Sequence, residues 1–236
     1  MIRRNLLLAG GALAVIALLG FGAAYAYFFS GLRSAPPPLA LATPTPGASA
    51  SAVPAGELAG IWTVASGSQA EYRVNEVFAG QTSSHQAVAR TSALSGGLTV
   101  AGLQVSNLTF TAQLASLTSV DTVSGYQVSN RDRLVQQSLQ TSQFPDAVFK
   151  AASFTLPTDV TAGQQVQVVV PGQLTIHGVT RDVTASVTLQ VAGGQVQALG
   201  IVNTDMATFN ITPPRAPFTT VDQKVEIDVK LNFSRA

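Results

Sequence analysis

A strictly alternating stretch, residues 172–191, constrains the fold more than any other part of the chain. It reads GQLTIHGVTRDVTASVTLQV. Leu174 and Ile176 alternate with polar residues before the turn, and apolar residues occupy every second position from Val183 to Val191 after it. A period of two is typical of a β-strand with one face in a core and the other in water. Because Gly178 tolerates a positive φ, we predict two antiparallel strands joined by a tight turn there.

The same alternation recurs through the rest of residues 60–233. It is clearest at the end, where Val225, Ile227, Val229, Leu231 and Phe233 alternate with polar residues. Together with the first hairpin, we predict strands at residues 61–65, 68–77, 85–93, 98–105, 106–117, 147–154, 165–170, 195–202 and 224–233. One short helix is predicted from Ser129, with Ser129 as its cap, Asp132 in its first turn and Pro145 beyond its end.

At least eight strands in one domain predict a closed sheet. Closure removes the unpaired edges, and an eight-stranded interior is wide enough for side chains or one slender ligand. The inward candidates are mostly Val, Ala, Leu, Ile and Thr, which leave space in the middle. We therefore predict an all-β fold, a closed eight-stranded antiparallel barrel with one short helix and a hydrophobic cavity.

The N-terminal region predicts a membrane segment. Residues 6–29 are apolar and uncharged, long enough for a bilayer of about 30 Å, and Arg3 and Arg4 precede them. We expect residues 1–33 to be a signal anchor or transmembrane helix, 34–59 a Pro/Ala/Ser/Thr-rich tether, and 60–236 the barrel domain. The protein would then cross the cell membrane once, with its N-terminus cytoplasmic and its barrel extracytoplasmic. Ala24-Tyr25-Ala26 leaves an alternative, a secreted or periplasmic protein cleaved near Ala26.

Composition and motifs argue against several function classes. The net charge is +1 without a basic stripe, so no nucleic-acid partner is expected. The chain has no cysteine, and neither nucleotide-binding nor nucleophile-elbow motifs occur. We predict no catalytic residues and no enzyme activity. The two histidines lie far apart: His177 is expected at a turn or rim and His85 in a solvated loop, so no metal site is predicted.

Two polar pairs could lie at a barrel rim. Arg131-Asp132 opens the short helix, and Arg181-Asp182 follows the tight turn. Either pair could orient a ligand head group or lock a loop through Arg–carboxylate pairing, and the alternative is a solvated surface position. We therefore take Arg131, Asp132, His177 and Arg181 as candidate rim residues.

Three segments resemble the YceI-like family, a lipid- or polyisoprenoid-binding domain. Residues 172–181, GQLTIHGVTR, are similar to the family's G-x-L-T-x-x-G-V-T-R hairpin. Arg131-Asp132 followed by Phe144-Pro145 and Phe149 is similar to a second family pattern, and residues 62–74 to the opening of the domain. One departure is clear: the family's common R-D-x-H-L lacks its histidine here, where Leu134 follows Arg133.

The resemblance implies a lipocalin-like barrel that holds a long isoprenoid chain in an apolar tube. Candidate lining residues are Tyr72, Phe110, Leu114, Leu134, Phe149, Leu174, Ile176, Val187, Leu189, Ile227 and Val229. The expected function is a membrane-tethered, non-catalytic binder of a quinone, a polyprenyl lipid or another long-chain lipid, with no cofactor beyond that lipid. One alternative is a structural or stress-linked envelope protein with a filled barrel and a protein-binding surface. Another is an enzyme acting on a lipid, which would need titratable groups converging at the barrel mouth.

Overall fold

The computed structural model describes residues 18–22, 33–41, 55–80, 83–123, 126–192, 195–216 and 219–236. Its helical elements are α2 (Ala55–Leu58), α3 (Ser129–Leu139) and the 3₁₀ turns η1 (Leu114–Ser116), η2 (Thr158–Ala162) and η3 (Met206–Phe209). Its strands are β1 (Arg33–Ser34), β2 (Gly60–Val64), β3 (Gln69–Phe78), β4 (Ser84–Thr91), β5 (Leu94–Ala101), β6 (Gln104–Gln113), β7 (Thr118–Ser119), β8 (Thr122–Val123), β9 (Asp146–Ala151), β10 (Phe154–Thr155), β11 (Gln165–Ile176), β12 (Val179–Ala192), β13 (Gln195–Asp205) and β14 (Thr219–Arg235).

Eight strands close into a ring, which confirms the predicted barrel. Their order is β13-β12-β11-β9-β6-β5-β2-β14, and β14 pairs back onto β13. Every pairing around the ring is antiparallel. Closure leaves these strands without a free edge along the paired residues, which is the reason expected for a sheet of this size.

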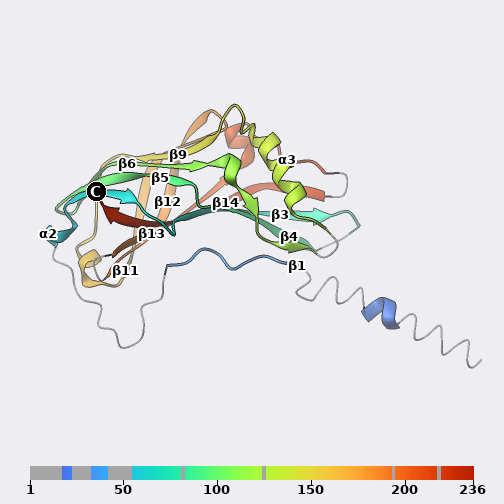
Figure 1. Ribbon diagram of the computed structural model, residues 1–236, viewed down its shortest axis with the longest axis horizontal. Helices are drawn as coiled ribbons and strands as arrows, with labels where there is room; N and C mark the ends of the chain where they lie inside the picture. The colour runs from blue at the N-terminus through green and yellow to red at the C-terminus, as the bar shows by residue number, and fades with distance from the viewer. Residues whose placement is uncertain are drawn as a thin grey trace, which may run out of the picture.

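The barrel continues beyond this ring at one end. Along the first part of β14 the neighbouring strand is β3, which pairs in turn with β4 and then β7. The wall from β4 back to β6 is completed there by η1 and α3, which pack on β7, β4 and β9. We call this the α3 end and the opposite end, near α2, the α2 end; Figure 1 shows the two at opposite ends of the molecule.

The hairpin of residues 172–191 has the predicted tight turn at Gly178. β11 and β12 pair from Gln165–Gln190 to Ile176–Val179, which leaves a two-residue turn at His177 and Gly178. Both turn residues have positive φ, 53° and 72°, as the favoured two-residue hairpin turns require. An added Cβ at Gly178 would lie 2.5 Å from the Phe144 ring, so packing and backbone both call for glycine.

Two local predictions were wrong. The β5–β6 turn lies at Gly102-Leu103 and not at the predicted boundary between residues 105 and 106, and Gly96-Gly97, which precede the predicted strand, lie within β5. The close approach of β2 explains why glycine stands at position 97 within β5, because a Cβ on Gly97 would lie 2.4 Å from the Trp62 backbone carbonyl oxygen on that neighbouring strand. Ser129 does not cap the helix: it is the first residue of α3, and Val128 precedes it without a side-chain capping bond.

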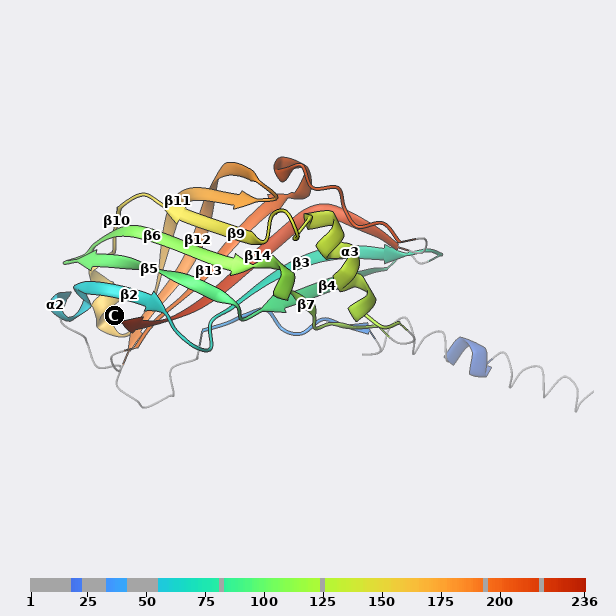
Figure 2. The same cartoon turned by 45° about the horizontal axis from the view of Figure 1, so that its top comes forward.

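Residues 33–41, which are the last residue of the predicted anchor and the first eight of the predicted tether, run along the outside of the barrel (Figure 2), and we call them the strap. Its first two residues, Arg33 and Ser34, pair with Val123 and Thr122. Leu39 and Leu41 are buried although they belong to a segment that the sequence presents as a solvated linker. Figure 2 shows the strap as a blue trace along the underside of the barrel. The domain boundaries, and the extended state of residues 42–54, stay predictions.

The membrane segment falls mostly outside the described residues. Of residues 6–29, only 18–22 are described; they are helical, and Leu18, Leu19 and Phe21 are exposed. Among the described residues, no helix has the length and apolar character that crossing a bilayer would require.

Candidate functional site

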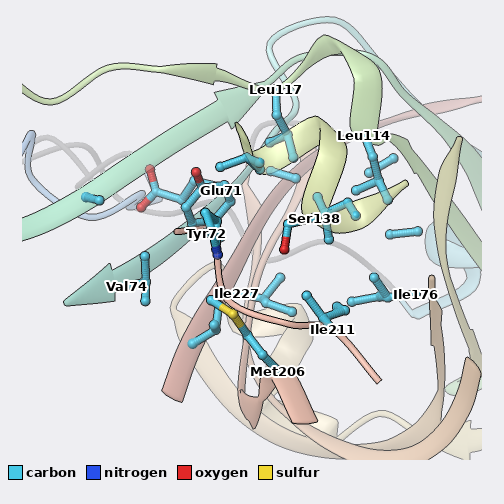
Figure 3. Close-up of a pocket in the computed structure, with 18 of the residues that line it drawn as sticks. Glu71, Tyr72, Val74, Leu114, Leu117, Ser138, Ile176, Met206, Ile211 and Ile227 are labelled. Atoms are coloured by element: carbon cyan, nitrogen blue, oxygen red, sulfur yellow. The ribbon is translucent and has the colours of Figure 1, made fainter. Parts of the chain in front are cut away.

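The barrel interior holds two apolar chambers in series. Chamber 1, at the α3 end, contains about 1430 Å³ of empty space, and chamber 2, at the α2 end, about 1130 Å³; both figures include the parts open to solvent. Nearly all of the surface that lines them is apolar. Figure 3 shows chamber 1, with Leu114 of η1 and Ser138 of α3 facing Ile211 and Met206 across the space.

The chambers meet at a waist of shared lining residues. These are Phe110, Phe149, Leu174, Ile227 and Val229, which border both spaces. Phe110 on β6 lies opposite Phe149 on the neighbouring strand β9. Leu174 on β11 lies opposite Phe149 from the other side of β9. Leu174 is buried and the other four side chains are partly buried, so the waist places only apolar side chains between the two spaces.

The α2 end is closed by apolar side chains and one polar anchor. Leu58, Val160 and Trp62 are buried there in the core that also carries Val105 and Phe233. The Trp62 indole donates a hydrogen bond of 2.8 Å to the Leu58 carbonyl, which fixes α2 against β2. Among the described residues, the lining of chamber 2 at this end is made of apolar side chains, so it offers a long ligand hydrocarbon contact; the nearby Arg235 guanidinium lies over the Trp62 ring, 5.3 Å from its centroid, and is not part of that lining.

The α3 end carries a buried ionic cluster. Arg131 of α3 donates to Asp121 at 2.7 Å and to Glu76 of β3 at 2.6 Å, and His85 of β4 donates to the second Asp121 oxygen at 2.7 Å. All four side chains are buried. The pairs join the helix, the loop before it and the two strands of the extended wall. Loop locking, one of the two roles considered for Arg131, is thus what the structure shows, and a solvated helix start is wrong.

The electrostatics of this cluster follow from burial and pairing. Burial raises the pKa of Glu76, and Arg131 only partly offsets it. Burial would also raise the pKa of Asp121, but hydrogen bonds from His85 and Arg131 outweigh it and lower that pKa. Burial raises the pKa values of Tyr72 and Tyr126, the phenols that line chamber 1 beside the cluster. These phenols therefore stay neutral donors at physiological pH.

His85 is not solvated, contrary to the prediction from its loop sequence. It lies in β4 directly opposite Glu76, and its ring is held by Asp121. Glu76, His85 and Asp121 bring three ligand atoms within 4.8 Å of one another, a grouping that could hold a metal ion and that sequence spacing did not predict. In this structure the Arg131 guanidinium pairs with both the Glu76 and the Asp121 carboxylates, so Arg131 supplies the positive charge between them.

All eleven predicted lining residues border a chamber. Six of them line only one chamber. Those in chamber 1 are Tyr72, Leu114, Leu134 and Ile176, and those in chamber 2 are Val187 and Leu189. The other five form the waist. Their contact with a ligand stays a prediction.

The predicted rim residues separate into one lining residue and three others. Arg131 lines chamber 1, whereas Asp132, His177 and Arg181 are not part of the lining. Asp132 accepts hydrogen bonds from the Ser119 amide and hydroxyl, at 2.9 and 2.6 Å, and so ties α3 to β7. His177 packs edge-on against Phe144, with ring centroids 5.1 Å apart, and Arg181 is exposed.

Sequence reasoning missed the lining supplied by the segment after β13. Met206, Phe209, Ile211 and Pro214 border chamber 1, and Phe209 is almost fully buried. The predicted strands end at residue 202 and resume at 224, and the prolines between them are typical of a loop. The Met206-Ala207-Thr208-Phe209 turn, capped by Asp205 at Ala207, was the one available signal.

A second buried ionic cluster lies on the outer wall, beneath the strap. Arg73 contacts Glu71 at 2.6 Å and Asp228 at 3.6 Å, and Arg90 pairs with the other Glu71 oxygen. Burial, with help from Glu226 and Glu71, raises the pKa of Asp228 to about 6. One Asp228 oxygen is buried without a partner. The cluster therefore holds a carboxylate that is costly to ionise.

Comparison with known proteins agrees with this geometry. The YceI-like domain model matches residues 62–233, which is most of the chain. The chain belongs to the YceI-like family. Comparison with curated proteins found no match.

Two solved structures are similar to this chain. A polyisoprenoid-binding domain from Saccharophagus degradans, implicated in plant cell wall breakdown, has 15% identity and a TM-score of 0.56, covering 75% of this chain and 99% of that one. Burkholderia cenocepacia BcnA has 17% identity and a TM-score of 0.49, covering 70% and 95%. At these identities the likeness concerns the fold.

Proposed function

We propose that the protein is a membrane-tethered, extracytoplasmic and non-catalytic binder of a long isoprenoid lipid of the quinone or polyprenyl type. The observation that carries this is the pair of apolar chambers joined at a non-polar waist. Each CH₂ group moved from water into such a space contributes about 0.8 kcal/mol, so a long chain binds with few polar contacts. The Saccharophagus degradans domain, described as polyisoprenoid-binding, supports the same class of ligand.

The distribution of polar groups gives the ligand a direction. Chamber 1 has Tyr72, Tyr126 and Arg131 in its lining, whereas charged side chains are absent from the described lining of chamber 2. The head group would therefore lie at the α3 end and the tail would pass the waist into chamber 2. Since Arg131 already pairs with two carboxylates, a neutral head such as a quinone or an alcohol suits this end better than a phosphate.

The alternative of a filled barrel that acts through its surface is disfavoured by the two chambers. The membrane tether is supported by the apolar run of residues 6–29 and by the arginines before it.

The test is direct. The full chain is purified from membranes in mild detergent, extracted with organic solvent and analysed by mass spectrometry, and the emptied protein is titrated with a fluorescent prenyl probe. We expect a co-purifying prenyl lipid and saturable binding of the probe. A protein that carries no lipid and shows no affinity for prenyl chains of any length would contradict the proposal.

A further inference from the structure

The strap is bound to the barrel at sites that a simple linker would not need. The Arg73 guanidinium donates to the Pro36 carbonyl at 3.1 Å, and that of Arg90 donates to the Pro37 carbonyl at 2.7 Å. These are the same arginines that form the outer-wall ionic cluster. Two buried leucines complete the attachment. Because both hydrogen bonds come from charged donors and two leucines of the segment are buried, the strap has a defined position on the barrel wall.

The strap begins at the α3 end. Its first residues, Arg33 and Ser34, pair with Val123 and Thr122, which are the two residues directly after Asp121 of the ionic cluster. The Ser34 and Thr122 hydroxyls lie 2.9 Å apart. From there the strap runs toward Glu71, away from the β3–β4 tip. Figure 1 shows β1 on the same side of the molecule as α3 and the tips of β3 and β4.

The apolar run ends close to this point in the sequence. Phe29 is its last residue, and residues 30–32 are all that separate it from Arg33. Even a fully extended chain spans no more than about 14 Å between Phe29 and Arg33, at about 3.5 Å per residue. If residues 6–29 cross the bilayer, Arg33 cannot be farther than that from the outer membrane surface.

We therefore infer that the strap holds the α3 end of the barrel against the membrane, so that a lipid moves between the bilayer and chamber 1 without crossing water. The inference rests on the membrane anchor and lipid binding proposed above, and it adds the docking face and the route. The partner is an anionic lipid surface. Among the described residues at this end, Arg133, Arg215 and Lys224 are exposed, and the exposed carboxylates are Asp222 and Asp146, which opens β9 beside η1.

The basic surface and the short connection act in the same direction. Exposed Lys and Arg side chains are attracted to an anionic bilayer, and the anchor keeps the effective lipid concentration high. The wall at this end is made of a helix and turns rather than a continuous strand ring, so it is the end that can open for a lipid. The α2 end, where the strand ring is complete, is directed away from the membrane.

The experiment uses the full chain in vesicles of phosphatidylcholine and phosphatidylglycerol. Because the sequence contains no cysteine, single cysteines accept one fluorophore each. Ala79→Cys labels the turn after β3 at the α3 end, and Ala101→Cys labels the β5–β6 turn at the α2 end; both positions are exposed. A lipid-borne headgroup quencher then reports which end touches the membrane. We expect quenching of the label at position 79 and none at position 101.

Two insertions separate tethering from docking. About 20 Gly/Ser residues between Ser30 and Gly31, reaching roughly 25 Å, release the barrel from its short connection but leave the strap attached. The same insertion after Ala48, beyond the strap, is the matched control. We expect the first insertion to remove most of the quenching at position 79 and to slow transfer of a fluorescent prenyl lipid from the vesicles, and the second to change neither.

Each outcome is decisive. Equal quenching of both labels, or of neither, in protein that floats with the vesicles would overturn the inference while leaving the proposed lipid binding intact. Protein that does not float would remove the anchor and the inference together. Loss of prenyl binding by emptied protein in detergent would instead contradict the proposed function, because that titration does not depend on the membrane.

Discussion

The two ends of the barrel are built on different physical principles. At the α2 end the strands are hydrogen-bonded into a complete ring, and the space inside is sealed by Trp62, Leu58 and Val160. At the α3 end the wall is completed by a helix and short turns, held by ion pairs between Arg131, Glu76 and Asp121. Apolar packing around a strand ring tolerates small shifts, whereas a buried ion pair depends on each partner. We therefore expect the α3 end to open when one partner of an ion pair is lost, whereas the structure of the α2 end should not depend on any single residue.

The strongest test of this comparison is Arg131→Met. Removing the guanidinium leaves Glu76 and Asp121 buried near one another without a counter-charge, which costs about 3–5 kcal/mol. We expect faster amide hydrogen exchange throughout α3 and a lower free energy of unfolding in urea, with little change in exchange at the α2 end.

Arg133→Met is the matched control, because Arg133 is exposed on the same helix and should change stability by less than about 0.5 kcal/mol. Unchanged exchange of α3 in Arg131→Met would mean that apolar contacts, not the ion pairs, hold this end.

Gly200→Phe sharpens the comparison from the other end. Gly200 lines chamber 2, and an added Cβ would lie 3.8 Å from Val187, so a larger side chain can enter the space. Filling it should displace three to five CH₂-sized groups of a long tail and cost about 2–4 kcal/mol of binding, at about 0.8 kcal/mol each.

A titration with prenyl probes of increasing length measures this. Gly200→Phe should keep its affinity for short probes and lose its affinity for long ones. Gly200→Ala is the control and should bind probes of every length as the parent does. Equal loss for short and long probes would show that the tail does not reach chamber 2.

Asp228→Asn tests whether a buried negative charge lowers the free energy of unfolding outside the α3 end. Folding raises the pKa of Asp228 to about 6, so between about pH 4 and 6 the folded chain binds the proton more tightly than the unfolded chain. The free energy of unfolding contributed by this group falls as pH rises through that window and stays low above it. Asparagine, which can still donate to Glu71, should therefore stabilise the protein by about 1–2 kcal/mol at pH 7–8.

Denaturation curves across this pH range test the prediction. The gap between the variant and the parent should widen up to about pH 6 and then stay constant. A gap that is independent of pH would show that the carboxylate is not the titrating group.

The smallest expected effect is that of Asp132→Asn. Asp132 accepts from the Ser119 amide and hydroxyl, and a neutral amide makes these hydrogen bonds weaker by about 1 kcal/mol. Hydrogen exchange should rise at Ser119 but not in β11 or β12. Asp182→Asn, at an exposed position, is the control. A change of similar size in both variants would contradict a specific tie between α3 and β7.

Much of the barrel could be predicted from sequence alone, because its cause is local. Apolar residues at every second position define which face of a strand is inward, and Gly178 marks the hairpin turn. Those two features account for the nine predicted lining residues that lie on strands, whereas Leu114 lies in η1 and Leu134 on α3. The apolar lining is thus a property of strand periodicity, and closure into a ring follows from the need to pair every edge.

Tertiary structure alone decided the polar parts. Glu76, His85, Asp121 and Arg131 are separated in sequence and belong to three elements and a loop, so no local pattern reveals that they meet. The strap is the same kind of case: its composition is that of a solvated linker, and only the arginines and the carboxylate on the wall explain its position. Periodicity records which side of a strand faces the core, whereas a buried charge is stable only where the fold supplies its partner.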